Sequence, residues 1–212
     1  MANTNTSLGD VNSESLIIFS IGHSNQPIET FLALLRQHEI QVLVDVRSSP
    51  YSKYVPHFNS TKLAITVEQA NIEYKFMGQE LGGRPDDDEF YDADSHVLYK
   101  RVATSPLFLK GIQRLMDIGA GSRTVIMCSE EDPAICHRHL LIGHVLTEQG
   151  VDLIHIRADG HLQNEKEINS REEQPFYTQS LWGEQLTDQE EQTWRSIRSV
   201  SRRKQQLNFS DL

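Results

Sequence analysis

The chain has 212 residues, and its 20 Lys and Arg against 30 Asp and Glu give a formal net charge of −10. This charge argues against a protein that coats nucleic acid, because such a protein needs many cations to neutralise phosphates. No apolar run approaches the roughly 20 residues of a membrane span, and the polar start lacks a signal-peptide pattern. Two Cys do not make a disulfide scaffold, so we expect a cytoplasmic protein with no membrane partner.

Five short apolar, β-branched segments predict buried strands. In chain order they are residues 16–21, 41–46, 71–76, 123–128 and 151–156. Segments with helical spacing of apolar residues lie between them, at 27–38, 105–118 and 132–149. Strands that alternate with helices predict an α/β fold with three layers. We expect a mostly parallel sheet of about five strands, with helices on both faces and a helical C-terminal extension.

The composition divides the chain into three parts. Residues 1–15 are rich in Asn, Thr, Ser and Gly and predict a disordered lead. Residues 16–162 carry the patterned segments and predict one α/β domain. Residues 163–212 are polar, and we expect a partly helical extension there with no further strand.

A helix is predicted in the extension, because residues 187–190 have capping-box spacing ahead of Trp194 and Ile197. Basic residues gather towards its end, at Arg195, Arg198, Arg202, Arg203 and Lys204. Acidic residues at the start and basic residues at the end suit the helix dipole, which favours a solvated surface helix. The alternative interpretation is that this Arg-rich tail binds nucleic acid or another acidic partner.

Polar or reactive side chains follow nearly every predicted strand. Ligands of parallel α/β sheets bind beyond the carboxyl ends of the strands, so these residues predict one site at that edge. The candidate substrate-binding residues are Gly22, Ser24, Arg47, Gly82, Gly83, Arg84, Arg138 and His155. The candidate catalytic residues are His23, Asp45, Cys128, Glu130, Cys136 and His137. The His residues are candidates for proton transfer, because their ordinary pKa lies near neutrality.

The densest of these segments runs from Cys128 to Arg138. Cys128 ends a predicted strand, and Cys136, His137 and Arg138 fall in or just beyond the first turn of the next predicted helix. A helix N-terminus lowers the pKa of a nearby thiol and favours an anion, and Arg suits phosphate or carboxylate. In the alternative interpretation both Cys are buried small hydrophobes, and Arg138 pairs with an acidic residue of the same segment.

Other chemistries fit the sequence less well. The candidate metal ligands are His23, Cys128, Cys136, His137 and His155. Structural zinc sites usually show closely spaced pairs, whereas the two Cys here are eight residues apart, so we predict no metal and leave the cofactor open. The sequence has no Cys-x-x-Cys redox pair, Walker loop or Gly-x-Gly-x-x-Gly fingerprint. A cysteine phosphatase would need Arg six residues after Cys128, where Ala134 stands.

Several motifs occur together in one order along the chain. They are Ile21-Gly-His-Ser-Asn25, Asp45-Val-Arg47 with Pro50, Leu81-Gly-Gly-Arg-Pro85, Cys128-x-Glu-x-x-Pro-x-x-Cys-His-Arg138 and His155-Ile-x-x-Asp-Gly160. Together they resemble the bacterial and archaeal domain-of-unknown-function family 488 over about residues 16–162. The resemblance implies a compact α/β domain with a shared polar site, and it brings no established reaction with it.

A weaker likeness is to rhodanese-type sulfurtransferases. Residues 43–47 and 125–128 look similar to strand ends of that family, in which Cys128 would carry the sulfur. The loop after Cys128 departs from the family, because Glu130, Glu131 and Asp132 stand where a rhodanese has a short loop that contains Gly. Their negative charge would oppose a thiolate.

The sequence thus favours an enzyme that performs hydrolysis or group transfer on a small anionic substrate, either a nucleotide or another phosphate-bearing compound. One alternative is a rhodanese-like sulfurtransferase that uses Cys128. Another is a non-catalytic module that binds a nucleotide or nucleic acid.

Overall fold

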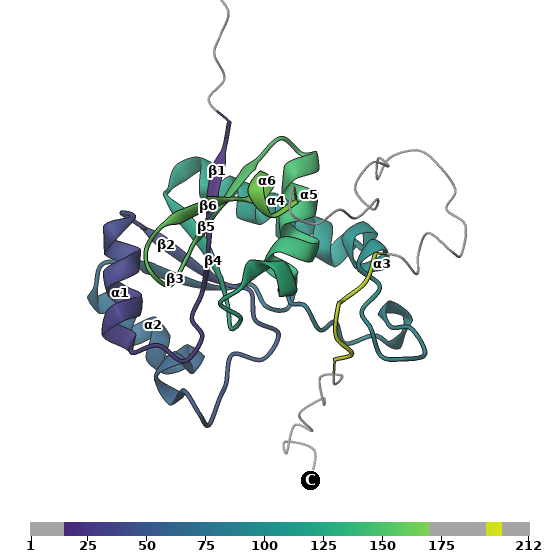
Figure 1. Cartoon of the computed structure of the whole chain (residues 1–212), viewed down its shortest axis with the longest axis horizontal. Helices are drawn as coiled ribbons and strands as arrows, with labels where there is room; N and C mark the ends of the chain where they lie inside the picture. The colour runs from purple at the N-terminus through teal and green to yellow at the C-terminus, as the bar shows by residue number, and fades with distance from the viewer. Residues whose placement is uncertain (1–14, 170–193, 201–212) are drawn as a thin grey trace, which may run out of the picture.

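A computed structural model describes residues 15–169 and 194–200 and shows a six-stranded sheet in the order β3-β2-β4-β1-β5-β6 (Figure 1). The strands are β1 (Ile17–Gly22), β2 (Val42–Asp45), β3 (Glu73–Phe76), β4 (Thr124–Cys128), β5 (Asp152–Ile156) and β6 (Leu162–Asn164). The first five pair in parallel, and β6 runs antiparallel to β5. The predicted α/β class with a mostly parallel sheet is confirmed.

Strand β6 corrects the expectation that no strand follows residue 162. The chain reverses after β5 at Gly160, whose φ of +86° is a conformation that favours glycine. The Gly160 N–H donates to the Arg157 carbonyl, and the Arg157 N–H donates to the His161 carbonyl, which closes a hairpin. The short strand β6 therefore depends on a turn and on backbone pairing, with no apolar run of its own.

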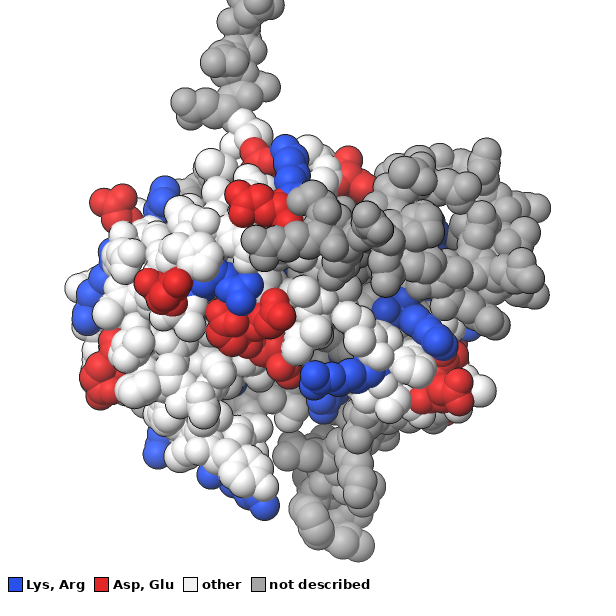
Figure 2. Space-filling view, in the orientation of Figure 1, with Lys and Arg blue, Asp and Glu red and all other residues white. Residues whose placement is uncertain are grey.

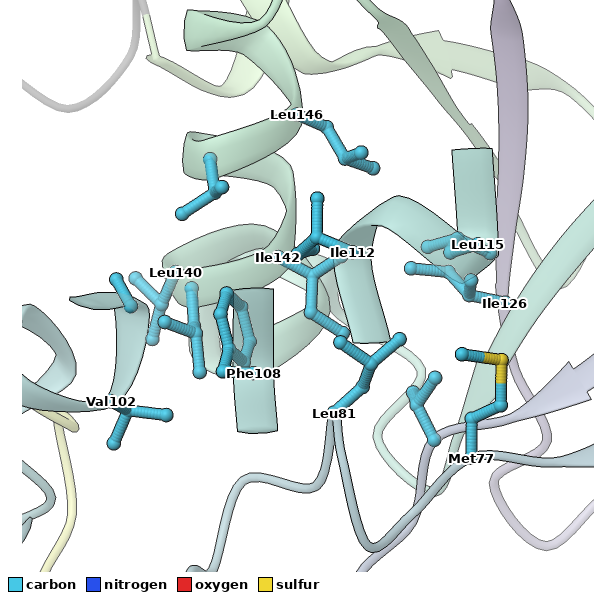
Figure 3. Close-up of a cluster of buried hydrophobic side chains, with 14 of the residues drawn as sticks. Met77, Leu81, Val102, Phe108, Ile112, Leu115, Ile126, Leu140, Ile142 and Leu146 are labelled. Carbon is cyan, nitrogen blue, oxygen red and sulfur yellow. The ribbon is translucent and has the colours of Figure 1, made fainter. Parts of the chain in front are cut away.

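Helices cover both faces of the sheet. Helices α1 (Ile28–Gln37) and α2 (Ser60–Gln69) pack on one face, where Phe19 and Leu43 point. The other face is covered by α4 (Pro106–Gly121) and α5 (His144–Glu148), and α3 (Tyr99–Thr104) packs against α4. Figure 3 shows the apolar core on this second face, where Leu81, Phe108 and Ile126 lie together. Helix α6 (Glu165–Asn169) follows β6.

The predicted helix at 132–149 is interrupted. Pro133–Ile135 form one 3-10 turn, Arg138–Gly143 are π-helical, and α5 begins only at His144. Asp132 caps the 3-10 turn, because its side chain accepts a hydrogen bond from the Ala134 N–H. Cys136 and His137 therefore lie between two helical segments, rather than in the first turn of one long helix. Two further 3-10 turns are Pro56–Phe58 and Asp88–Phe90.

Residues 194–200, here called the tail segment, are not helical, so the predicted helix is wrong for them. Arg195 forms an antiparallel bridge with Leu98, and the Trp194 carbonyl accepts the Tyr99 N–H. The Trp194 ring packs 4.3 Å from the ring of His144, and its Nε1 donates to the Leu140 carbonyl. Docking of the Trp ring thus overrides the local helix signal. The remaining residues of that predicted helix lie outside the described residues.

Surface charge on the face drawn in Figure 2 is mixed, with Lys and Arg interspersed among Asp and Glu. No helix in residues 15–169 or 194–200 has the length and apolar character needed to cross a bilayer.

Candidate functional site

A pocket of about 470 Å³ opens beyond the carboxyl ends of the neighbouring strands β2 and β4. After β2 the chain passes to α2 on one face of the sheet, and after β4 it passes to α5 on the other. A crevice between strands whose connections diverge in this way is the usual ligand site of such sheets. The lining residues that carry reactive or polar groups include Arg47, Ser48, Arg84, Cys128, Ser129, Glu130, Cys136, His137 and Arg198.

Two thiols and an imidazole meet in this pocket. The Nδ1 atom of His137 lies 3.7 Å from the Sγ atom of Cys128 and 3.8 Å from that of Cys136. The 3-10 turn after β4 brings the two Cys together although they are eight residues apart in sequence. Cys128, Cys136 and His137 are here called the thiol cluster.

Arg138 stands behind the thiol cluster and is only 1% exposed. Its guanidinium donates to the Cys136 Sγ at 3.4 Å, to the Ser20 Oγ at 2.9 Å and to the Glu130 carbonyl at 2.6 Å. No carboxylate within residues 15–169 or 194–200 forms an ion pair with it, in contrast to the alternative interpretation in which an acidic residue of its own segment pairs with it. The Arg138 side chain does not line the pocket, so its effect on a ligand would pass through Cys136.

The two thiols differ in acidity. The hydrogen bond with Cys136, together with burial, raises the pKa of the Cys128 thiol well above its ordinary value. Burial also opposes ionisation of Cys136, but the hydrogen bond from Cys128 and the charge of Arg138 outweigh it and hold the pKa of Cys136 well below its ordinary value. Cys136 is therefore the more acidic of the pair, which disfavours Cys128 as a sulfurtransferase thiolate.

A buried chain of hydrogen bonds continues from Arg138 away from the pocket. Ser20 Oγ lies 2.6 Å from His155 Nδ1, and His155 Nε2 lies 2.5 Å from Glu165 Oε2. The other carboxylate oxygen of Glu165 lies 2.6 Å from His139 Nδ1. Burial lowers the pKa of His155, so His155 is neutral and holds the Ser20 hydroxyl against Arg138. His155 thus belongs to the support of Arg138 and does not line the pocket.

Asp45, Arg47 and His23 form a second buried network. Arg47 binds both carboxylate oxygens of Asp45, at 2.8 and 2.6 Å, and also donates to the Phe58 carbonyl. Its Nη1 donates to His23 Nε2 at 3.0 Å, while His23 Nδ1 donates to the Ser24 carbonyl. Burial, followed by the charge of Arg47, lowers the pKa of His23 to about 4. These three side chains are occupied with one another, and of the three only Arg47 lines the pocket.

The two Gly motifs serve close backbone packing. A Cβ atom on Gly22 would lie 1.8 Å from the Glu130 carbonyl oxygen, and the Ser24 N–H donates to the Ser129 carbonyl. This turn therefore supports the loop after β4 and does not line the pocket. A Cβ atom on Gly83 would lie 2.8 Å from His137 Cγ, and one on Gly82 would lie 2.3 Å from the Gly78 carbonyl oxygen. The Gly-Gly loop thus packs directly against the thiol cluster.

Three charged side chains reach the pocket without an internal partner. The guanidinium groups of Arg84 and Arg198 and the carboxylate of Glu130 are exposed. None of these three groups has an ion-pair or hydrogen-bond partner within residues 15–169 and 194–200. The Ser48 Oγ accepts the Arg84 N–H at 2.9 Å and fixes the start of that side chain. Two available cations and one acid therefore face the same space as the thiols.

The family model for the domain of unknown function DUF488 matches residues 27–145. The chain belongs to this family. The DUF488 match includes Asp45, Arg47, the Gly-Gly loop and the whole thiol cluster. The motifs at Ile21–Asn25 and His155–Gly160 lie outside it. Searches among curated proteins and among solved structures found no match, and nothing in these comparisons supports the likeness to rhodanese.

Sequence reasoning missed residues on both sides of the DUF488 segment. Ser20 and Glu165 hold Arg138 through His155, yet neither stands in a motif that marks it. Arg198 was assigned to a surface helix, whereas the tail segment brings it to the pocket. Ser48 was a detectable candidate, because it follows Arg47 directly after a strand end.

Proposed function

We propose that this protein is an enzyme that performs hydrolysis or group transfer on a small, phosphate-bearing anion in the pocket beyond β2 and β4. One observation carries the proposal: the guanidinium groups of Arg84 and Arg198, which have no ion-pair or hydrogen-bond partner in the described part of the chain, line the same pocket as the thiol cluster. Cations without internal partners favour an anionic ligand, since charge-assisted hydrogen bonds to phosphate are among the strongest that a protein makes.

The size and lining of the pocket support a small-molecule substrate. A volume of about 470 Å³ is within the range of pockets that hold nucleotides and other compounds of similar size. The thiol cluster and the cations Arg84 and Arg198 line the same pocket. This arrangement would let the two cations hold the phosphate beside the reactive groups.

Glu130 is the candidate for proton transfer. Its carboxylate lines the pocket and is exposed, and no cation within residues 15–169 and 194–200 pairs with it. Asp45 and His23 fit this role less well, because Arg47 occupies both of them. The geometry therefore favours Glu130 over Asp45 and His23 for proton transfer.

The test compares adenosine with AMP and inorganic phosphate by isothermal titration calorimetry. We expect both phosphate-bearing compounds to bind and adenosine to bind far more weakly. Arg84→Gln and Arg198→Gln should each weaken AMP binding about tenfold, the effect of one lost charge-assisted hydrogen bond. The matched control is Arg36→Gln, because Arg36 is an exposed cation on α1 away from the pocket. Equal affinity for adenosine and AMP, or an equal effect of the control, would contradict the proposal.

Turnover has its own readout. Release of inorganic phosphate from AMP and from p-nitrophenyl phosphate reports hydrolysis, and transfer to an added alcohol or thiol reports group transfer. Glu130→Gln should lower the rate at least a hundredfold while leaving AMP affinity nearly unchanged, the usual size of a general acid–base contribution. Binding without turnover of either compound would instead favour the alternative of a nucleotide-binding module. The nucleic-acid partner that the Arg-rich tail suggests stays a prediction.

A further inference from the structure

The thiol cluster has the shape of a metal site. The three atoms Cys128 Sγ, Cys136 Sγ and His137 Nδ1 all lie within 4.8 Å of one another. Tetrahedral zinc, with bonds of about 2.3 Å to sulfur and about 2.0 Å to nitrogen, places nitrogen and sulfur about 3.5 Å apart. The observed separations of 3.7 and 3.8 Å from His137 Nδ1 to the two sulfurs are close to this spacing.

The proton on His137 is placed as a metal ligand requires. His137 Nε2 lies 3.2 Å from the Val46 carbonyl oxygen, which can only accept a hydrogen bond. Nε2 therefore carries the proton, and the Nδ1 lone pair points at the two sulfurs. Metal-binding His residues are typically held in this way, by a carbonyl or carboxylate on the nitrogen that does not bind the metal.

The surroundings also suit two thiolates. Arg138 donates from Nε to the Cys136 Sγ, so a buried cation partly balances the negative charge that metal-bound sulfur retains. Gly83 lets the Gly-Gly loop lie against the His137 ring and fixes its position. All three residues of the thiol cluster line the pocket, so the remaining tetrahedral direction faces the ligand space.

Two other groups of candidate ligands are already occupied. His155 Nε2 and His139 Nδ1 both face Glu165 at hydrogen-bond distance in a buried network without access to the pocket. Asp92 accepts the N–H groups of Asp94 and His96 in a surface turn and pairs with Arg195. The thiol cluster differs from both, because all three of its residues line the pocket.

We propose that Cys128, Cys136 and His137 bind one tetrahedral divalent transition metal, with zinc the best match, and that its fourth position is open to the pocket. Three protein ligands with one open position are typical of catalytic rather than structural zinc. A metal there would supply Lewis-acid chemistry next to the cations Arg84 and Arg198. The catalytic part of this inference rests on the proposed function, whereas the metal binding stands on the geometry alone. This proposal differs from the expectation of no metal that the sequence alone favours.

Cobalt(II) is the probe for the first test. The full chain is reduced, stripped with a chelator and titrated with Co²⁺ without oxygen. We expect one Co²⁺ per chain, with the visible bands of tetrahedral cobalt and a near-ultraviolet thiolate-to-cobalt band. Cys128→Ser and Cys136→Ser should each weaken or remove the thiolate band, and His137→Ala should lower the affinity at least tenfold. His161→Ala is the matched control, because His161 is exposed and lies outside the cluster.

A second test needs no substitution. Zn²⁺ should protect both Cys of the wild-type chain from iodoacetamide, measured by mass spectrometry, and a chelator should restore alkylation. The metal site is wrong if Co²⁺ gives no thiolate band, if the Ser variants bind it as the wild type does, or if reduction leaves a Cys128–Cys136 disulfide. AMP binding by the metal-free chain is measured separately. If the chain binds AMP but no metal, only the proposed metal site is contradicted. If it binds metal but no AMP, only the proposed substrate class is contradicted.

Discussion

The Nε atom of Arg138 lies 3.4 Å from the Sγ atom of Cys136, at the centre of a buried network that joins β1 to the loop after β4. Arg138→Gln removes a cation that is 1% exposed and leaves the Glu130 and Glu131 carbonyls without their donor. We expect the free energy of unfolding to fall by about 3 kcal/mol, measured by urea denaturation.

The matched control for that change is Arg36→Gln, which removes an exposed cation from α1. It should alter the free energy of unfolding by less than about 0.5 kcal/mol. If both variants unfold at the same urea concentration, Arg138 does not hold the network together.

Gly83 controls the position of the His137 ring. In Gly83→Ala the added methyl group would lie 2.8 Å from His137 Cγ and 2.9 Å from Nδ1, so the ring must move. We expect Co²⁺ binding to weaken about tenfold while the circular dichroism spectrum stays unchanged. Gly121→Ala is the control, because nothing lies within 4 Å of its added methyl group. Unchanged Co²⁺ affinity in Gly83→Ala would show that metal binding does not depend on the position in which Gly83 holds the His137 ring.

Trp194 holds the tail segment on the domain. Trp194→Ala removes the hydrogen bond to the Leu140 carbonyl and the ring contacts with Tyr99 and His144. We expect the free energy of unfolding to fall by about 2 kcal/mol. Urea denaturation monitored by circular dichroism measures this change. AMP binding should also weaken, because Arg198 belongs to the same segment. Ile197→Ala, at a side chain that is 54% exposed, should leave stability nearly unchanged. AMP binding that survives Trp194→Ala would argue against Arg198 as a ligand.

His144 makes stability depend on pH. Burial, followed by the charge of Lys100, lowers the pKa of His144 to about 4 in the folded chain, whereas its unfolded value is 6.5. The unfolded chain therefore takes up a proton first, so this contribution is complete above pH 6.5 and is lost as the pH falls towards 4. Over that range it amounts to about 3 kcal/mol at most.

Urea denaturation at pH 7 and pH 4.5 measures this effect. In His144→Gln the fall in stability between the two pH values should be smaller than in the wild type. The groups around His144 that also carry charge are Lys100, His139, Glu148 and Glu165. His161→Gln, at an exposed position, should keep the wild-type fall. If the free energy of unfolding depends on pH identically in all three chains, His144 is not a source of the fall in stability.

The sequence predicts the parallel sheet because each of its five strands has an apolar or alternating pattern of its own. It does not predict β6, because Leu162–Asn164 pair only through their backbone after the Gly160 turn. The capping box ahead of Trp194 is a local signal, and docking of the Trp ring prevails over it in the tail segment. Sequence patterns thus predict strands in which apolar residues recur regularly. They miss elements that depend on a turn or on contacts with residues distant in sequence.

In the candidate site too, some residues can be predicted from sequence patterns and others cannot. Cys128, Cys136, His137 and Arg84 are detectable from the sequence, because they follow strand ends or crowd into one segment. That the two Cys meet depends on the 3-10 turn at Pro133–Ile135, so their spacing of eight residues hides the cluster. The link from Glu165 to Arg138 passes through His155 on β5 and Ser20 on β1, and contacts between residues so far apart in sequence produce no periodic pattern.

The pocket is lined by residues from inside and from outside the range that the family model matches. The thiol cluster and Arg84 lie within residues 27–145, which the family shares, whereas residues 196–200 contribute their wall from outside that range. The matched range therefore holds the thiol cluster and the pocket cation Arg84, and the tail segment holds the pocket cation Arg198. Substitutions in the tail segment would change one wall of the pocket while the sulfur and imidazole groups stay as they are.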